Sequence, residues 1–433
     1  MSTPEIQSKI ERNSRFNITV NMIEGAAFWF GANFVSAQTI LPLYVSHFTD
    51  SKLLLGLLAG LNAAGWLVPQ LFTANWAQRL PRKKFGPANL GLWVERLPVF
   101  LMAPAALLAV TRPALSITAF FVLFAWQQLG IGLIAVAWQA MLAKVIPADR
   151  RGRFLGVTTG IGTVTGMIGA GIAARFLQRY AFPTGYVYCF IAGAIMAFVS
   201  WFFLSLTREP ADEVLPPKVS QLEYFKGLPA VLRADANFGR FLVGEFLMNA
   251  STMATGFLAV YAVQHWGLSD AQAGTYTVSL LVGQAISNLF FGVLADRKGH
   301  KIVLEISALS AAFAVAVALI APTPLVLHAS FALAGCAVAG FYQSGMMVAM
   351  EFGRPEIRAT YIGINSTVRG ASAGLAPIFG GWLAATVGYP GLFIAALIFG
   401  LAGFAVMRFS VHDPRVANVH TASTAAAQAA ASD

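Results

Sequence analysis

The stretch Thr184–Leu206, TGYVYCFIAGAIMAFVSWFFLSL, decides the fold class of this chain. It contains no charged side chain, and it is as long as the roughly 20 apolar residues that a helix needs to cross a bilayer. Lipid offers no hydrogen-bond partner to an open backbone, so an apolar segment inside it must form a helix or a closed barrel. The stretch therefore predicts a membrane-spanning helix.

Similar apolar blocks follow one another along the whole chain. The 433 residues are 57% hydrophobic and only 11% charged, whereas soluble domains carry roughly 25% charged residues. We therefore expect an all-α membrane protein of twelve transmembrane helices that is surrounded by the lipid bilayer. The predicted spans lie near 17–46, 53–74, 86–110, 114–144, 153–175, 184–206, 238–264, 271–294, 302–321, 325–350, 360–385 and 389–410.

The net charge of +10 is distributed unevenly between the predicted loops. Most of the 29 Lys and Arg residues lie in the tails and in the even-numbered loops, and the opposite side holds only Lys52, Arg112, Arg175 and Arg179. Basic loops stay on the cytoplasmic side, so we expect both termini in the cytoplasm and the protein in the plasma (inner) membrane. The positive charge thus reflects topology and predicts no nucleic-acid partner.

Landmarks recur in the same order in the two halves of the chain. Trp138-Gln139 of the fourth span matches Tyr342-Gln343 of the tenth, and Glu24 of the first span matches Glu245 of the seventh. Ordered matches of this kind indicate a duplicated unit of six helices, which places a solute site between the halves. The predicted organisation is a cytoplasmic tail at 1–14, a six-helix bundle at 15–207, a central cytoplasmic loop at 208–236, a second bundle at 237–410 and a disordered cytoplasmic tail at 411–433.

The segment Gly292–Lys301, GVLADRKGHK, follows the eighth span. It resembles the cytoplasmic signature of the major facilitator superfamily, and the resemblance extends to the spans, the central loop and the repeat. The copy after the second span, Ala74–Lys83 (ANWAQRLPRK), lacks the acid and the glycines. The resemblance therefore implies a cytoplasmic gate centred on Asp296, or else a packing turn without a switching role. The other gate candidates are Gly292, Arg297, Gly299, Arg150, Arg151, Arg153, Arg354 and Arg358.

Ionisable side chains inside the predicted spans are the sharpest indication of function, because each is costly unless it is paired or reached by water. Glu24 and Glu245 lie within the first and seventh spans, which line the solute path in the resembled family. A carboxyl group away from water binds a proton more readily, so both are candidates for proton coupling; the alternative is a fixed ion pair or an interfacial cap. Glu95 and Arg96 predict a buried ion network, in which Arg96 needs a further anion such as Glu24.

Arg369 in the eleventh span has no counterpart in the first half. An arginine beside water suits a carboxylate or phosphate group of a solute, but it also suits a structural pair with Glu245 or a carbonyl group. Amide and aromatic side chains complete a cavity lining that binds polar organic solutes, although packing explains the aromatic ones equally well. These candidates are Asn249, Gln128, Gln139, Trp138, Tyr342, Gln343, Asn288 and Asn365.

The predicted function is secondary active transport of a small organic solute by alternating access, coupled to protons. Glycine runs in the fifth and eleventh spans resemble a motif of the family's drug/proton antiporters, so a drug-type exporter is one alternative; close helix packing also explains such runs. A membrane sensor or scaffold without transport is the other alternative. The chain has no phosphate-binding loop and no paired metal ligands, so we expect no enzyme activity, no cofactor and no metal. We also expect a monomer.

Overall fold

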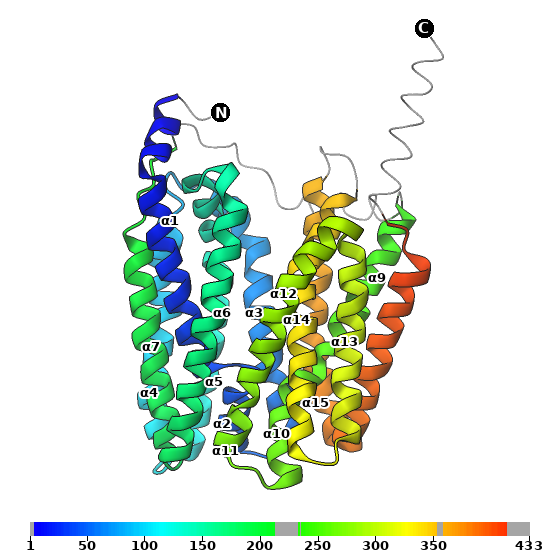
Figure 1. The fold of residues 1–433 in the computed structure, drawn as a ribbon. Helices are drawn as coiled ribbons and strands as arrows, with labels where there is room; N and C mark the ends of the chain where they lie inside the picture. Colours follow the sequence, from blue (N-terminus) through cyan, green and yellow to red (C-terminus); the bar gives the residue numbers. More distant parts are fainter. Residues whose placement is uncertain (1–3, 213–232, 234, 353–357, 414–433) are drawn as a thin grey trace, which may run out of the picture.

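The computed structural model describes residues 4–212, 233, 235–352 and 358–413, and all regular structure in these ranges is helical. The helices form two bundles that stand side by side, with the first half on the left and the second on the right of Figure 1. This arrangement confirms the predicted all-α fold in two bundles.

The first half contains the elements from α1 to α7. Its bounds are α1 Pro4–Ala32, η1 Asn33–Val35, α2 Ile40–Ser46, α3 Lys52–Gln78, η2 Phe85–Leu90, η3 Leu92–Arg96, α4 Leu97–Leu107, α5 Pro113–Val145, α6 Ala148–Arg179 and α7 Thr184–Ser205. The segments η2 and η3 are π-helical, and η1 is a 3-10 turn.

The second half repeats the pattern from α9 onward. Its bounds are α9 Ala236–Ser251, η4 Thr252–Ala254, α10 Thr255–Trp266, α11 Asp270–Gly274, α12 Tyr276–Lys298, α13 His300–Ile320, η5 Pro324–Val326, α14 Leu327–Glu351, α15 Arg358–Ala405 and η6 Val406–Ser410. The long helix α15 breaks at Gly388, whose φ of 78° suits a residue without Cβ, and so contains the predicted eleventh and twelfth spans.

Nine helical segments of the described residues are long and apolar enough to cross a membrane. This number is lower than the twelve predicted spans for physical reasons. The first span carries charges and is interrupted at Asn33–Val35, the third contains π-helical turns with Glu95 and Arg96, and the last two are counted as one segment.

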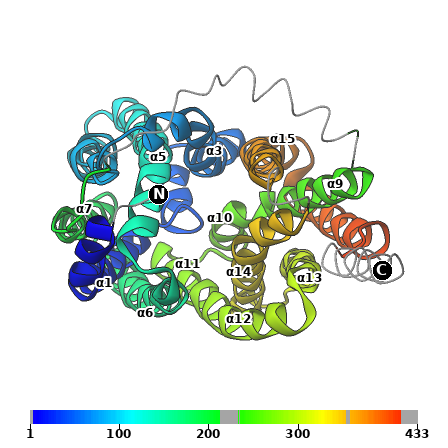
Figure 2. The same cartoon turned by 90° about the horizontal axis from the view of Figure 1, so that it is seen from above.

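The two halves contact each other along two seams. In Figure 2, α3 lies beside α15, and α6 lies beside α12. The helix α1 begins and η6 ends at the same end of the molecule, at the top of Figure 1, which we call the terminal end. The ribbons of the two halves lie closer together at the opposite end.

The glycine runs explain how closely these helices pack. A Cβ atom placed on Gly60 of α3 would lie 2.6 Å from the Gly374 carbonyl oxygen of α15, and one placed on Gly169 of α6 would lie 2.5 Å from the Phe30 carbonyl oxygen of α1. Small residues are required where two helix backbones approach this closely. Both runs therefore have a packing role, as one of the two interpretations of the sequence holds.

Candidate functional site

A buried ion pair lies inside the second half. Glu245 of α9 is 1% exposed, and its Oε2 accepts a hydrogen bond of 2.9 Å from Asn249 Nδ2, one helical turn later. Nε of Arg369, from α15, lies 3.7 Å from the same oxygen. The spacing of Glu245 and Asn249 on one helix face was visible in the sequence, but the pairing with α15 required the fold.

Arg369 is held by the backbone as well as by the carboxylate. Its Nη2 donates a hydrogen bond of 3.0 Å to the carbonyl oxygen of Phe341, and its side chain remains 19% exposed. A Cβ atom on Gly345 would lie 2.9 Å from both Arg369 Nη1 and Glu245 Oε1. The absence of a side chain at Gly345 therefore gives the pair its space. Both structural partners that the sequence suggested for Arg369, Glu245 and a carbonyl group, are present.

Two acceptor atoms in this cluster receive no hydrogen bond from the described atoms. Glu245 Oε1 and Asn365 Oδ1 are buried and have no hydrogen-bond partner among the described atoms. Asn365 Nδ2 donates to the Gly345 carbonyl oxygen at 3.0 Å, so the free amide oxygen belongs to the same neighbourhood. Buried acceptors without partners are costly, and a proton on the carboxyl group or a donor group of a solute would relieve that cost.

Tyr342 adds an exposed aromatic ring next to the cluster. The residue is 74% exposed, and its hydroxyl group lies within electrostatic reach of Arg369. The cluster thus offers a guanidinium group, a carboxyl group and an aromatic ring to a solute.

The equivalent acid of the first half has different neighbours. Glu24 of α1 is buried, accepts a hydrogen bond of 3.2 Å from Ser200 Oγ of α7, and attracts Arg96 electrostatically. Arg96 also contacts Glu95 directly. Both Glu95 and Arg96 lie in the π-helical segment η3.

The remaining predicted lining residues do not join one cluster. Gln128 is buried on α5, Gln139 is exposed on the same helix, and Trp138 packs against the apolar cluster that contains Met141 and Val145. On the second half, Asn288 of α12 is half-buried, as is Gln343, which lies 3.7 Å from the position of a Cβ on Gly292. A solute contact for any of these residues stays a prediction.

The predicted cytoplasmic gate lies largely outside the described parts of the structure. This holds for Arg354 and for the side chains of Asp296, Arg151, Arg153 and Arg358. Arg150 and Arg297 are exposed. Gly299 joins α12 to α13 with a φ of 94°, a conformation that favours glycine. The chain therefore turns at Gly299, and the switching role of Asp296 stays a prediction.

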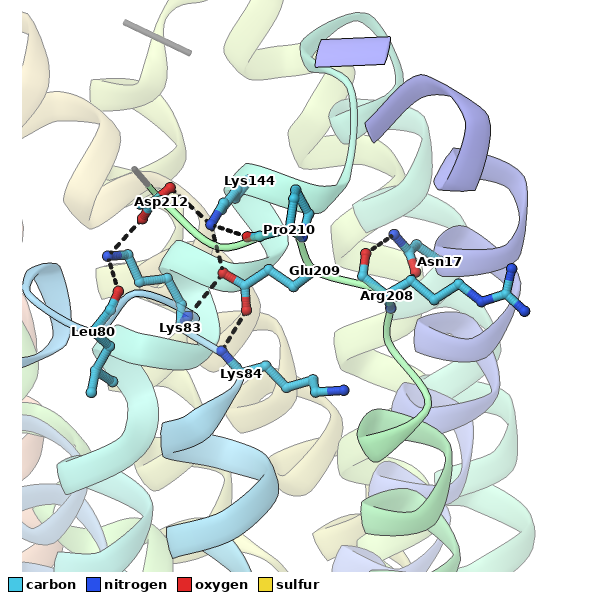
Figure 3. A network of polar contacts seen from close by, with 9 residues as sticks. All are labelled: Asn17, Leu80, Lys83, Lys84, Lys144, Arg208, Glu209, Pro210 and Asp212. Atoms are coloured by element: carbon cyan, nitrogen blue, oxygen red, sulfur yellow. Dashed lines mark hydrogen bonds and ion pairs between the residues drawn. The ribbon is translucent and has the colours of Figure 1, made fainter. Parts of the chain in front are cut away.

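A polar network at the terminal end was not predicted (Figure 3). The carboxylate of Glu209, which follows α7, is fully buried and accepts hydrogen bonds of 2.8 and 2.7 Å from the backbone amides of Lys83 and Lys84. Lys144 Nζ of α5 lies 3.1 Å from Glu209 and 2.8 Å from Asp212. This network joins the loop after α3, the end of α5 and the chain after α7.

The network changes the pKa values of its members. Burial lowers the pKa of Lys84, although the carboxylate of Glu209 opposes this change. Burial raises the pKa of Asp212, but hydrogen bonds and charges from Lys144 and Lys83 outweigh it, so this pKa is lowered overall. The only indication of this network in the sequence was the acid Glu209 in the string Leu206-Thr-Arg-Glu-Pro210, together with the basic loop Arg79–Lys84. The sequence does not show that these two segments contact each other.

A second unpredicted cluster joins the halves at the end opposite the termini. Asp270 of α11 accepts hydrogen bonds at the same oxygen from His47, at 2.5 Å, and from the Tyr186 hydroxyl group, at 2.7 Å. Lys52 Nζ, also from the first half, donates to the Ala384 carbonyl oxygen of α15 at 2.9 Å. The sequence places His47 at the end of a span, without any indication of its partner.

The architecture and the sequence agree with one known family. The family model described as Major Facilitator Superfamily matches residues 24–244 and 240–432. The chain belongs to this superfamily. It is therefore an integral membrane protein that belongs to a transporter family rather than to a family of enzymes.

Solved structures of superfamily members show the same fold at low sequence identity. The nucleoside transporter NupG is 15% identical with a TM-score of 0.68, over 91% of this chain and 98% of that chain. A D-xylose–proton symporter is 16% identical with a TM-score of 0.63, over 93% and 99% of the two chains. A bacterial homologue of the human lysosomal transporter Spinster, in an inward-facing conformation, is 15% identical with a TM-score of 0.65, over 94% and 97%.

Curated relatives match only part of the chain. A Na(+), Li(+), K(+)/H(+) antiporter of Planococcus maritimus is 27% identical over 41% of this chain and 43% of its own length. The putative transporter SVOPL of Homo sapiens is 26% identical over 49% and 44%. The 4-hydroxybenzoate transporter PcaK of Pseudomonas aeruginosa is 41% identical over 14% and 13%. The chain thus spans less than half the length of the curated relatives it matches.

Proposed function

We propose that this superfamily member carries a small organic anion across the plasma membrane by alternating access, together with a proton. The Glu245–Arg369 pair supports this proposal. Each residue comes from a different spanning segment, α9 and α15, and one carboxylate oxygen has no described partner. We also propose that the terminal end faces the cytoplasm, as the distribution of basic residues indicates.

In this proposal, protonation of Glu245 releases Arg369 for the solute. A neutral carboxyl group no longer attracts the guanidinium group, which then binds a carboxylate or phosphate of the solute through its fork of N–H donors. The exposed ring of Tyr342 can pack against the apolar part of an organic solute. Loss of the solute restores the Glu245–Arg369 pair and releases the proton, so that solute and proton move together.

The charge of the site favours an anion over an inorganic cation. The antiporter relative is named for Na+, Li+ and K+, but the buried acids Glu245 and Glu24 each lie beside an arginine, which repels a bound cation. The PcaK relative is named for 4-hydroxybenzoate, an aromatic carboxylate, and so agrees in charge with Arg369. The drug-exporter alternative was based on the glycine runs, and close helix packing already explains these glycines.

Solute and proton fluxes in proteoliposomes test the proposal. A panel of aromatic and aliphatic carboxylates is offered across an imposed pH gradient, and internal pH is followed with a trapped dye. We expect carboxylate uptake with proton entry, lost in Glu245→Gln and in Arg369→Gln. Glu305→Gln is the matched control, because Glu305 is a buried acid of α13 that pairs with Lys301 at 3.2 Å outside the cluster.

Three results would contradict parts of this proposal. Uptake without proton movement would exclude coupling, and export of apolar cations would favour the drug-type alternative. A wild-type protein that moves none of these solutes while remaining folded would favour the sensor or scaffold.

A further inference from the structure

The contact of His47, Tyr186 and Asp270 joins the two halves at the end opposite the termini. His47 follows α2 and Tyr186 lies at the start of α7, both in the first half, whereas Asp270 begins α11 in the second. One carboxylate oxygen of the second half thus receives two donors from the first half. Separation of the halves at this end requires both hydrogen bonds to break.

The imidazole of His47 is held in a defined orientation. Its ring stacks on Phe182 with centroids 4.2 Å apart and an interplanar angle of 20°. Because the Asp270 carboxylate accepts, the Nε2 atom of His47 must carry a hydrogen in this contact. A protonated ring adds a full charge to that hydrogen bond, whereas a neutral ring keeps at most the hydrogen bond alone.

Water reaches this contact. A cavity of about 360 Å³ is lined by His47, Tyr180, Phe182, Tyr186 and Asp270, among others. The side chains of His47 and Asp270 are 33% and 19% exposed. Protons therefore have access to the imidazole in this conformation.

We propose that His47, Tyr186 and Asp270 form a second proton-binding site, a latch that closes the solute path on the side opposite the termini when His47 is protonated. The latch rests on the alternating access of the proposed function, but it is distinct from the Glu245–Arg369 pair. A proton taken from that side is bound at Nε2 or Nδ1 of the ring, and the imidazolium attracts the Asp270 carboxylate across the seam. Release of the proton removes that attraction and favours opening.

Several other titratable groups lie around the latch. The ring of His47 contacts Asp270 and Tyr186 directly, Tyr180 lines the same cavity, and Tyr44 and Cys189 lie near Tyr186. A second histidine, His265, lies in the last turn of α10. Histidine is the side-chain type that titrates between pH 5 and 8. His265 stacks on Tyr261 of its own helix at 5.1 Å, so it provides a matched control at the same end.

Distances between the halves test the latch without any solute. The full chain in lipid nanodiscs, with Cys189→Ala and Cys336→Ala, carries spin labels at Thr111→Cys and Thr323→Cys, which are exposed in the two halves. Double electron–electron resonance then gives the ratio of open to closed states. We expect this ratio to rise about fivefold between about pH 5.5 and about pH 8, the equivalent of ~1 kcal/mol for a partly exposed ion pair.

The variants decide the assignment. His47→Gln and Asp270→Asn should each abolish the pH response, and His265→Gln should preserve it. A wild-type ratio that does not change with pH, or a full response in folded His47→Gln protein, would overturn the latch. Asp270→Asn provides the same test if His47→Gln fails to fold. The response should persist in Glu245→Gln protein, so a failure of the latch and a failure of the proposed transport mechanism are separable.

Discussion

Removal of Arg369 should destabilise the protein more than removal of its partner Glu245. In Arg369→Gln the carboxylate of Glu245 stays buried at 1% exposure, with one hydrogen bond from Asn249 as its described support. In Glu245→Gln the guanidinium group keeps the Phe341 carbonyl oxygen and its access to water. The two substitutions thus leave charges behind in unequal surroundings.

The magnitudes follow from this difference. Breaking a buried ion pair from one side costs ~3–5 kcal/mol. The separation of 3.7 Å, the 19% exposure of Arg369 and the remaining hydrogen bond of Asn249 reduce the expected loss for Arg369→Gln to ~2–3 kcal/mol. For Glu245→Gln we expect ~1 kcal/mol. The double variant should lose less than the sum, with a coupling energy of ~1–2 kcal/mol.

Unfolding by SDS in mixed micelles, followed by tryptophan fluorescence, measures these free energies for the wild type, both single variants and the double variant. Arg240→Gln is the control, because Arg240 is exposed on the same helix as Glu245, and its loss should stay within ~0.5 kcal/mol. Equal losses for the two single variants, together with strict additivity in the double variant, would refute the reasoning.

Three further predictions concern the terminal end and the seam between the halves. Glu209→Gln should lower the free energy of unfolding by ~2–4 kcal/mol, because it removes a fully buried carboxylate that accepts hydrogen bonds from two backbone amides and pairs with Lys144. In the same SDS titration, the control Glu11→Gln should change this free energy little, because Glu11 is exposed. Since the folded pKa of Asp212 is lowered, its contribution should be present above its unfolded pKa and be lost as the pH falls through the folded value; the melting temperature of Asp212→Asn should therefore depend less on pH below about pH 4 than that of the wild type. Gly60→Val should lower the free energy of unfolding by ~1–3 kcal/mol, because the larger side chain forces α3 away from α15. The control is Gly171→Val, which should not cause this loss, because a Cβ at Gly171 meets no atom within 4 Å. Thermal unfolding of both variants measures the difference.

The class and the repeat of this protein followed from the sequence alone. Apolar runs such as Thr184–Leu206 leave the backbone no alternative to a helix in lipid. The segment Gly292–Lys301 indicated the family, and the family model and the solved structures agree. These features are local or periodic, so they can be read without knowing which segments meet.

The partners of the buried charges depended on tertiary structure. Glu24 and Glu245 occupy matching positions in the two halves, but the arginine beside Glu24 comes from η3 and the one beside Glu245 comes from α15. The duplication predicts the acids and not these arginines, because an ion pair depends on which helices pack together.

Contacts between distant segments could not be predicted from the sequence for the same reason. Glu209 lies 126 residues from Lys83, and His47 lies 223 residues from Asp270. Each side chain has an ordinary position at the end of a span, and many acids and bases at such ends compete as partners. Only the packing of α3, α5 and α7, and of α2 against the start of the second half, brings these particular groups within hydrogen-bond distance.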